Sequence, residues 1–247
     1  MQRHGSGDMS EAAQTTIGAI VASDVRTARI FEEYGIDYCC GGRRSLEDAC
    51  RETGVDADAV AGSLAALPPQ SDFGSNPTRW PLDRLVDHIV ETHHAYVRAA
   101  MPRIARQLAK VVELHAARHP ELSSAAESFG ALQQELPQHL LKEERILFPY
   151  VRALVAASAG APRPSMPFGT IENPIRMMER EHRDAVDELN LLRQVTDGFA
   201  VPEDCATYRS CFAELAQFER DLRRHIHLEN NVLFPRAIAL EEGHRTR

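Results

Sequence analysis

The chain has 247 residues, 43% of them hydrophobic and 26% charged, which is enough apolar material to build a core. Its formal net charge of −8 argues against nucleic acid as a partner, because a phosphate-binding surface needs a basic face. The first fifteen residues hold no apolar signal-peptide core, and the apolar run at 17–22 is too short to span a bilayer. We therefore expect no membrane partner and a cytoplasmic location, where the five cysteines would be free, catalytic or metal-linked.

The N-terminal quarter is predicted to be a flexible tail followed by a small helical domain. Residues 1–14 are polar, whereas Ile17 and Phe31 belong to a set of apolar residues at roughly helical spacing. Gly35 is typical of a helix end, and Ser45 is predicted to cap the next helix. We assign residues 1–14 to the tail, 15–67 to the domain and the segment 68–80, with its prolines and glycine, to a linker.

The remainder of the chain is predicted to be an all-α four-helix bundle. Long helical stretches alternate with short joins, and no alternating apolar run is long enough for a sheet. Helices of this length, roughly 40–50 Å at 1.5 Å per residue, pack as antiparallel bundles. The stretches are 81–116, 121–157, 171–197 and 202–241, and they make a domain at 81–241 of two hairpins, 81–157 and 171–241.

One motif occurs twice in this region. HLLKEERILFPYV occupies residues 139–151 and HIHLENNVLFPRA occupies residues 225–237, so the two copies lie 86 residues apart. Residues four apart share a helix face, so each histidine lies beside the glutamate of its own motif. These pairs are His139 with Glu143 and His225 with Glu229. The Leu-Phe-Pro that follows both pairs at the same offset makes the repeat far more specific than a His/Glu step alone.

The helix that precedes each motif offers one further histidine at a matching distance. His94 lies 45 residues before His139, and His182 lies 43 residues before His225. Two such hairpins packed about a pseudo-twofold axis would direct four histidines and two glutamates to a shared point in the bundle core. The predicted metal ligands are His94, His139, Glu143, His182, His225 and Glu229.

A set of this type suits two iron or manganese ions, which accept mixed imidazole and carboxylate ligands. Each ion would take two histidines, the glutamates could bridge, and open positions would remain for water, dioxygen or nitric oxide. Zinc more often takes three or four ligands dominated by sulfur or imidazole. Two alternatives stay open: ordinary surface or core histidines, and ligation through the Glu-x-x-His steps at Glu91 and Glu179, as in ferritin-like bundles.

Two acidic residues close to the ligands are further candidates. Glu135 lies one turn before His139, and Glu181 directly precedes His182. Each is predicted to accept a hydrogen bond from a ligand or to relay protons, and a solvated helix charge is the alternative for each. His227, two residues from both His225 and Glu229, is expected to point away from the site.

Proline follows each His/Glu turn. Pro149 and Pro235 lie inside helical stretches, where proline removes a backbone hydrogen bond. Each proline is expected to kink its helix; helix termination near residues 148 and 234 is the alternative.

On these motifs the bundle resembles hemerythrin-like proteins with paired His-His-Glu motifs. Together with YGIDYCCGG at 34–42, residues 15–240 resemble the repair-of-iron-centres family, di-iron proteins linked to iron–sulfur cluster repair after nitrosative and oxidative stress. The resemblance implies two iron ions per chain, with His94, His139, His182 and His225 as terminal ligands and Glu143 and Glu229 as bridging carboxylates.

Cys39 and Cys40, which precede Gly41 and Gly42, allow two interpretations. A vicinal thiol pair at a turn could bind or transfer iron, take up nitric oxide or form a redox disulfide. The alternative is one structural thiol beside an exposed one. The family resemblance favours the functional interpretation.

The resemblance implies repair of damaged iron–sulfur clusters by iron donation, by nitric oxide reduction or by both, so that enzymatic activity stays open. The partners would be damaged iron–sulfur proteins or a cluster assembly scaffold, together with nitric oxide and dioxygen, and the small domain could form a homodimer contact. The alternative is a hemerythrin-like dioxygen carrier or sensor. That class uses five histidines where this chain offers four well-placed ones, and it has no use for a cysteine pair.

Overall fold

The structure is a computed structural model, and it describes residues 15–68, 76–165, 169–201 and 205–245. Within these ranges every regular element is a helix, which confirms the all-α prediction, and one isolated bridge joins Thr16 to Ser45. None of the described helices has the length and hydropathy that crossing a membrane requires. The predicted tail at 1–14 and most of the predicted linker at 68–80 lie outside the described residues.

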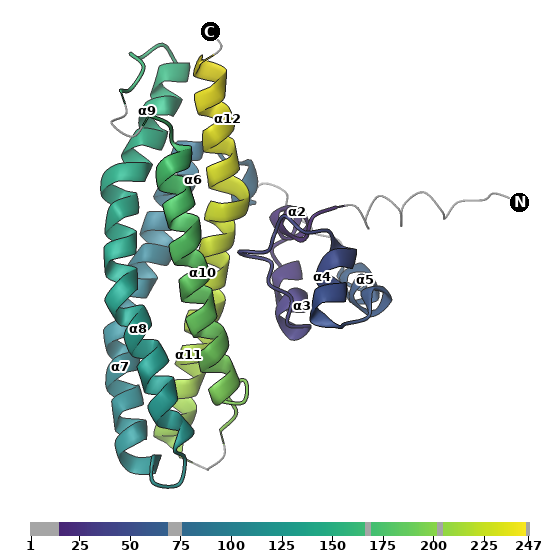
Figure 1. Ribbon diagram of the computed structural model, residues 1–247, viewed down its shortest axis with the longest axis vertical. Helices are drawn as coiled ribbons and strands as arrows, with labels where there is room; N and C mark the ends of the chain where they lie inside the picture. The colour runs from purple at the N-terminus through teal and green to yellow at the C-terminus, as the bar shows by residue number, and fades with distance from the viewer. Residues whose placement is uncertain (1–14, 69–75, 166–168, 202–204, 246–247) are drawn as a thin grey trace, which may run out of the picture. The chain divides into compact units, whose positions relative to one another are not determined.

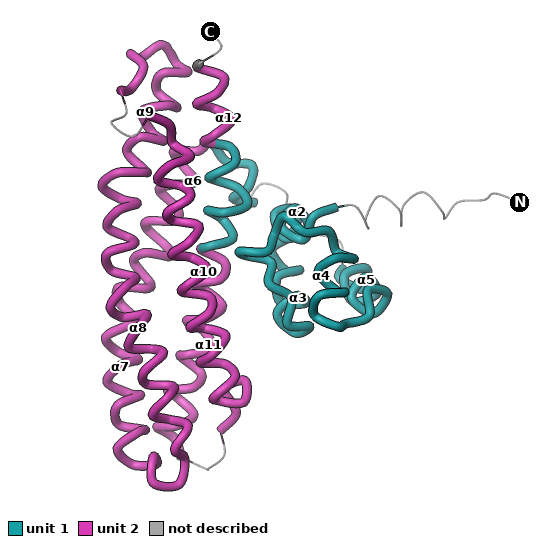
Figure 2. Tube along the Cα trace, in the orientation of Figure 1, with its two compact units in different colours: residues 1–81, 226–236 teal, residues 82–225, 237–247 magenta. Residues whose placement is uncertain are grey.

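The internal contacts divide the chain into two compact units, which have different colours in Figure 2. The first unit comprises residues 1–81 and 226–236, and the second comprises residues 82–225 and 237–247. Residues 226–236 lie within one long helical stretch but group by their contacts with the N-terminal residues. The sequence alone places this segment only in the bundle.

The first unit consists of short helices whose ends are set by capping residues. Thr16 accepts a hydrogen bond from the Ala19 backbone, and Ser45 accepts one from Asp48, as its sequence position predicts. Gly54, with φ of 70°, ends its helix in the left-handed region that glycine enters without strain. The helices are α2 (Ile17–Ser23), α3 (Thr27–Glu33), α4 (Leu46–Thr53), α5 (Ala57–Ala65) and the 3₁₀ turn η1 (Pro77–Arg79).

The core of this unit forms where α3 and α4 pack against α5, and α2 packs against the turn η4 (Glu229–Leu233). Ile17, Phe31 and Cys39 are fully buried, and Tyr38 is 1% exposed. The Cys39–Cys40 turn is therefore held inside a packed unit rather than displayed on a loose loop.

The second unit is built around long amphipathic helices, α7, α8, α10 and α11, each with one apolar face. Figure 1 shows the long helices α7, α8, α10 and α11 running lengthwise, and α8 packs against both α7 and α10. Their apolar stripes meet in a core that includes Ile104, Leu132 and Leu189, all fully buried. The helices are α6 (Leu82–His88), α7 (Ala95–His115), α8 (Glu121–Lys142), α9 (Phe148–Ser158), α10 (Glu172–Val195), α11 (Ala206–Leu228) and α12 (Phe234–Arg245).

Three π-helical turns interrupt these helices, and the sequence did not predict them. They are η2 (Ile89–His94), η3 (Glu143–Leu147) and η4 (Glu229–Leu233). At η3 the backbone N–H of Phe148 donates to the Glu143 carbonyl, and at η4 Phe234 donates to Glu229. The alternative of helix termination near 148 and 234 is wrong, because α9 and α12 continue through Pro149 and Pro235. The wider turn changes the hydrogen-bonding register just before each proline, which has no N–H to donate.

Candidate metal centre

The six predicted ligands come together. Two groups of four side chains each offer ligand atoms that all lie within 4.8 Å of one another. One group pairs His94 with His225, the other pairs His139 with His182, and both include Glu143 and Glu229. None of the six is more than 4% exposed, so the cluster is shielded from bulk solvent.

Each ligand has a defined place in its helix. His94 ends the π turn η2, whereas His139, His182 and His225 lie on the α-helices α8, α10 and α11. The two glutamates occupy equivalent positions: Glu143 is the first residue of η3 and Glu229 is the first residue of η4. The repeated His/Glu step therefore lies immediately before a π turn in both copies.

The Nε2 atom of each imidazole is its inner nitrogen, which faces the cluster, and Nδ1 is its outer nitrogen. The inner nitrogens lie close to one another and to the Glu143 carboxylate. The Nε2 atoms of His94 and His225 are 3.1 Å apart, and those of His139 and His182 are 3.0 Å apart. Glu143 places Oε2 3.4 Å from His94 Nε2 and Oε1 3.3 Å from His139 Nε2. One carboxylate thus presents one oxygen to each imidazole pair.

This donor set fits bound metal. Four imidazoles and two carboxylates in a dry core are the mixed ligands that iron or manganese accepts. Burying carboxylates is costly unless positive charge compensates them, and a cation would supply that charge. The chemistry of these side chains therefore supports a cation site, in agreement with the ligand prediction.

The outer nitrogen of His139 is bonded to a predicted residue. His139 Nδ1 lies 2.8 Å from Glu181 Oε2, and Lys142 also binds Glu181. The hydrogen bond from His139 is the largest influence on Glu181, and together with Lys142 it outweighs partial burial and lowers the pKa of Glu181 to about 2. Glu181 is therefore an ionised acceptor that fixes the orientation of the His139 ring.

The outer nitrogen of His94 is bonded to a residue that the sequence analysis missed. His94 Nδ1 lies 2.7 Å from Glu144 Oε1, and Arg98 Nη2 lies 2.7 Å from the same oxygen. Burial opposes ionisation of Glu144, but the hydrogen bonds from His94 and Arg98 outweigh it and lower its pKa. The one available signal was the spacing of His94 and Arg98, four residues apart on one helix face.

The other acidic candidates lie away from the two groups. Glu135 and Glu91 are exposed and Glu179 is half-buried, and none of the three belongs to either set of clustered ligand atoms. The ferritin-like alternative through Glu91 and Glu179 is therefore not supported. For Glu135 the geometry favours the solvated alternative.

Two buried histidines adjoin the predicted ligands in sequence without belonging to the ligand set. His93 lies 3.0 Å from Asp221 through Nδ1, and its ring stacks parallel to that of His225 at a centroid distance of 5.7 Å. His227, predicted to point away, is absent from both metal groups but is only 2% exposed. It packs edge-on against Tyr38, and burial lowers the pKa of His227 to about 4.

The Cys39–Cys40 turn is organised by one carboxylate. Asp37 accepts hydrogen bonds from the backbones of Cys39, Cys40 and Gly41, and the Cys39 thiol donates to it at 3.1 Å. Cys39 is fully buried, whereas Cys40 is half-buried. All five cysteines lie in the described ranges, and no disulfide joins any of them.

The same turn is held by two asparagines of the first unit. Asn231 donates to the Cys39 carbonyl at 2.9 Å, and Asn230 donates to the same carbonyl at 3.3 Å. A Cβ atom at Gly42 would lie 2.2 Å from Asn231 Oδ1, so only glycine allows this approach. Close packing of the Asn231 side chain against the backbone therefore explains the glycine at position 42.

Comparisons with known proteins agree with this geometry. Residues 85–237 match the family model described as the Hemerythrin HHE cation binding domain, and residues 13–68 match one described as a Domain of Unknown function (DUF542). The fold and the buried His/Glu cluster thus define a hemerythrin-type cation-binding protein, and the chain belongs to the hemerythrin HHE family. This confirms the predicted hemerythrin-like bundle.

More particularly, the chain is similar over most of its length to iron–sulfur cluster repair proteins. It is 34% identical to the iron-sulfur cluster repair protein YtfE of Enterobacter sp. (strain 638), covering 91% of this chain and 97% of the relative. The protein of the same name from Edwardsiella ictaluri (strain 93-146) is 34% identical over 90% of this chain and 96% of its own length. That of Musicola paradisiaca (strain Ech703) is 32% identical over 91% and 96%. The resemblance to the repair-of-iron-centres family is confirmed.

Proposed function

We propose that this chain repairs iron–sulfur clusters damaged by nitrosative or oxidative stress, and that its bundle holds two iron ions for that work. The disposition of Glu143 carries the proposal: one carboxylate oxygen faces His94, and the other faces His139 and His182. A carboxylate shared between two imidazole pairs supports a two-metal centre rather than a single ion. The relatives named for cluster repair cover both the bundle and the Cys39–Cys40 domain, which favours repair over a plain dioxygen carrier.

The two groups of side chains suggest how the candidate ligands would be divided between two ions. One ion would be held by His94 and His225 and the other by His139 and His182, with Glu143 and Glu229 shared. Bound iron would supply redox chemistry and open positions for nitric oxide or dioxygen. The protein itself orients the imidazoles, shields the site from water and keeps the carboxylates in place.

Iron donation is the repair activity that we propose as the primary one. Iron held partly by shared carboxylates is easier to release than iron in an all-nitrogen site, and damaged iron–sulfur proteins would receive it. Reduction of two nitric oxide molecules to nitrous oxide and water at the same centre is the second activity; the two electrons would come from the two ferrous ions and the two protons from solvent. Cys39 and Cys40 are proposed to transfer iron or take up nitric oxide. We also propose a cytoplasmic location, where the five cysteines of the chain would stay reduced.

The test has two parts. We expect about two iron ions per chain after anaerobic purification, and restoration of activity when the loaded protein is mixed with an enzyme whose [4Fe–4S] cluster was damaged by nitric oxide. Glu135→Gln, at an exposed position outside the cluster, serves as the control variant. A protein that binds two irons but leaves the damaged enzyme inactive would refute repair by donation. Nitrous oxide produced when nitric oxide is added to the loaded, ferrous protein would then support the second activity.

A further inference from the structure

The two groups of candidate ligands share a further feature. In each group, the Nδ1 atom of one histidine is hydrogen-bonded to a carboxylate that a basic side chain also binds. In the His139–His182 group this carboxylate is Glu181, which Lys142 also binds. In the His94–His225 group it is Glu144. Glu144 was not among the predicted site residues.

The contact with Glu144 determines which nitrogen of His94 can bind metal. A carboxylate oxygen that already accepts a hydrogen bond from Arg98 is an acceptor for His94 as well, so Nδ1 carries the proton donated to Glu144 Oε1. The Nε2 atom, which faces Glu143 and His225, then presents its lone pair to the cluster. A carboxylate in this position also increases the basicity of the imidazole.

Arg98 completes the arrangement. It lies one helical turn after His94 and donates to the same oxygen of Glu144, so two donors from one helix face hold a single acceptor. The Arg98 side chain is 48% exposed and that of Glu144 is 23% exposed, so this pair forms the outer edge of the site. The three residues also link the first and second helices of one hairpin.

We propose that Glu144 is a positioning residue for His94, and that Arg98 holds Glu144 in the orientation this requires. The proposal rests on the proposed metal site and adds a function to residues that touch no metal. Glu144 fixes the tautomer and ring orientation of His94 before the ion arrives, so the His94–His225 position is ready to bind. Glu181 and Lys142 provide the equivalent arrangement for His139.

Glu144→Gln is the most direct test, because it keeps the shape and removes the charge. We expect the affinity for one of the two ferrous ions to fall by about 10–100-fold, the usual effect of losing an outer partner of a metal-bound histidine. Competition with a chromophoric ferrous chelator would measure this, and the absorption spectrum of the loaded centre should change as well. Glu144→Asp is expected to recover part of the affinity.

Arg145→Ala is the matched control, because Arg145 is exposed and directly follows Glu144. Thermal unfolding of the metal-free variants checks that they are folded. If wild type binds two ions and Glu144→Gln binds both with unchanged affinity and spectrum, the positioning role is overturned while the metal site stands. If wild type binds no iron, the proposed function fails first.

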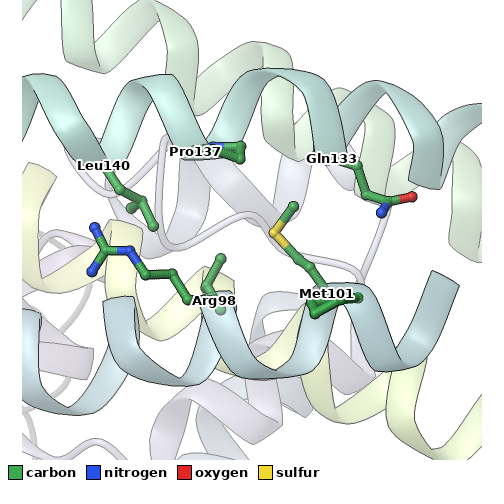
Figure 3. Close-up of a pocket in the computed structure, with 7 residues that line it drawn as sticks. Arg98, Met101, Gln133, Pro137 and Leu140 are labelled. Atoms are coloured by element: carbon green, nitrogen blue, oxygen red, sulfur yellow. The ribbon is translucent and has the colours of Figure 1, made fainter.

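The role of Arg98 allows a chemical rescue. Arg98 lies beside a cavity of about 260 Å³ that Met101, Pro137 and Leu140 also line, as Figure 3 shows. In Arg98→Ala the space left by the side chain would open into this cavity, which gives a small cation access to Glu144. We expect added guanidinium ion to restore iron affinity in this variant, and urea, which has a similar shape but no charge, to have no effect. Equal responses to both, or none to guanidinium, would contradict the role of Arg98.

Discussion

Each hairpin of the bundle contributes two histidines and one glutamate to the candidate site, but the surroundings of these residues differ. The fifth residue after the motif histidine is Glu144 in the first copy (139 + 5) and Asn230 in the second (225 + 5). Glu144 is hydrogen-bonded to His94, whereas Asn230 donates a hydrogen bond to the Cys39 carbonyl. The position before the first-helix histidine is His93 in one copy and Glu181 in the other. The two copies thus share the residues that would hold metal, while the residues at neighbouring positions make different contacts.

The backbone shows the same divergence. Both second helices contain a π turn after the ligand pair, at η3 and η4. On the first helices, η2 ends at His94, whereas α10 runs as a regular helix through His182. Equivalent ligands therefore reach the cluster from unequal backbones.

The largest expected effect is the loss of iron affinity on replacing either glutamate of the repeated motif. Glu143→Gln and Glu229→Gln should each weaken both metal positions, because each glutamate belongs to both groups. We expect a loss of iron affinity at least as large as the ~10–100-fold typical of an outer partner. Iron content after dialysis against a chelator measures it. Full retention of both ions in either variant would show that the two copies do not contribute equally.

The next effect concerns the repeated phenylalanine. Phe148 and Phe234 are 2% and 1% exposed, and each directly follows a π turn. Replacement of either by Ala should lower the free energy of unfolding by about 3–5 kcal/mol. Denaturant unfolding of the metal-free protein measures the change. If the decreases in the free energy of unfolding differ by several kcal/mol between the two variants, the two copies pack differently despite the shared Leu-Phe-Pro.

A third test uses the residue after the repeated proline, which is Tyr150 in one copy and Arg236 in the other (150 + 86). Tyr150 donates to Glu241 at 2.8 Å, and burial followed by this contact raises the pKa of Tyr150 to about 12. Tyr150→Phe should lower stability by about 1.5–3 kcal/mol, the usual value for a hydrogen bond to a charged group.

The pH dependence of the stability difference between wild type and Tyr150→Phe has a predictable direction. A phenol with a raised pKa stabilises the folded state fully below its unfolded pKa, about 10, and that contribution is lost as pH rises through about 12. The stability difference between wild type and Tyr150→Phe should therefore be constant at neutral pH and shrink in alkali. A difference that grows with pH would contradict the assignment.

The smallest effect concerns the second copy alone. Asn230→Ala removes the donor to Cys39 but no metal ligand, so iron affinity should stay within about twofold of wild type. The Cys39–Cys40 turn should exchange its amide hydrogens faster, by up to roughly tenfold for the loss of a hydrogen bond worth about 1 kcal/mol. A marked loss of iron would show that Asn230, like Glu144, acts on a ligand.

Much of the site follows from spacing along helices. The step of four from His139 to Glu143, its repetition at His225, and the matching His94 and His182 were enough to predict all six clustered residues. Glu181 was also named, because it adjoins a ligand. Glu144 was missed: its contact to His94 joins residues 50 apart on different helices, and helix packing rather than local spacing determines which glutamate reaches that nitrogen.

The helical class, the repeated His/Glu pattern and the resemblance to iron–sulfur cluster repair proteins could all be predicted from the sequence, because they depend on short spacings along the chain. Tertiary structure decided that the helices continue past Pro149 and Pro235 through π turns, that His227 is buried against Tyr38, and that residues 226–236 group with the N-terminal unit. Those features depend on which surfaces meet, and burial and hydrogen-bond partners between distant segments cannot be obtained from periodicity.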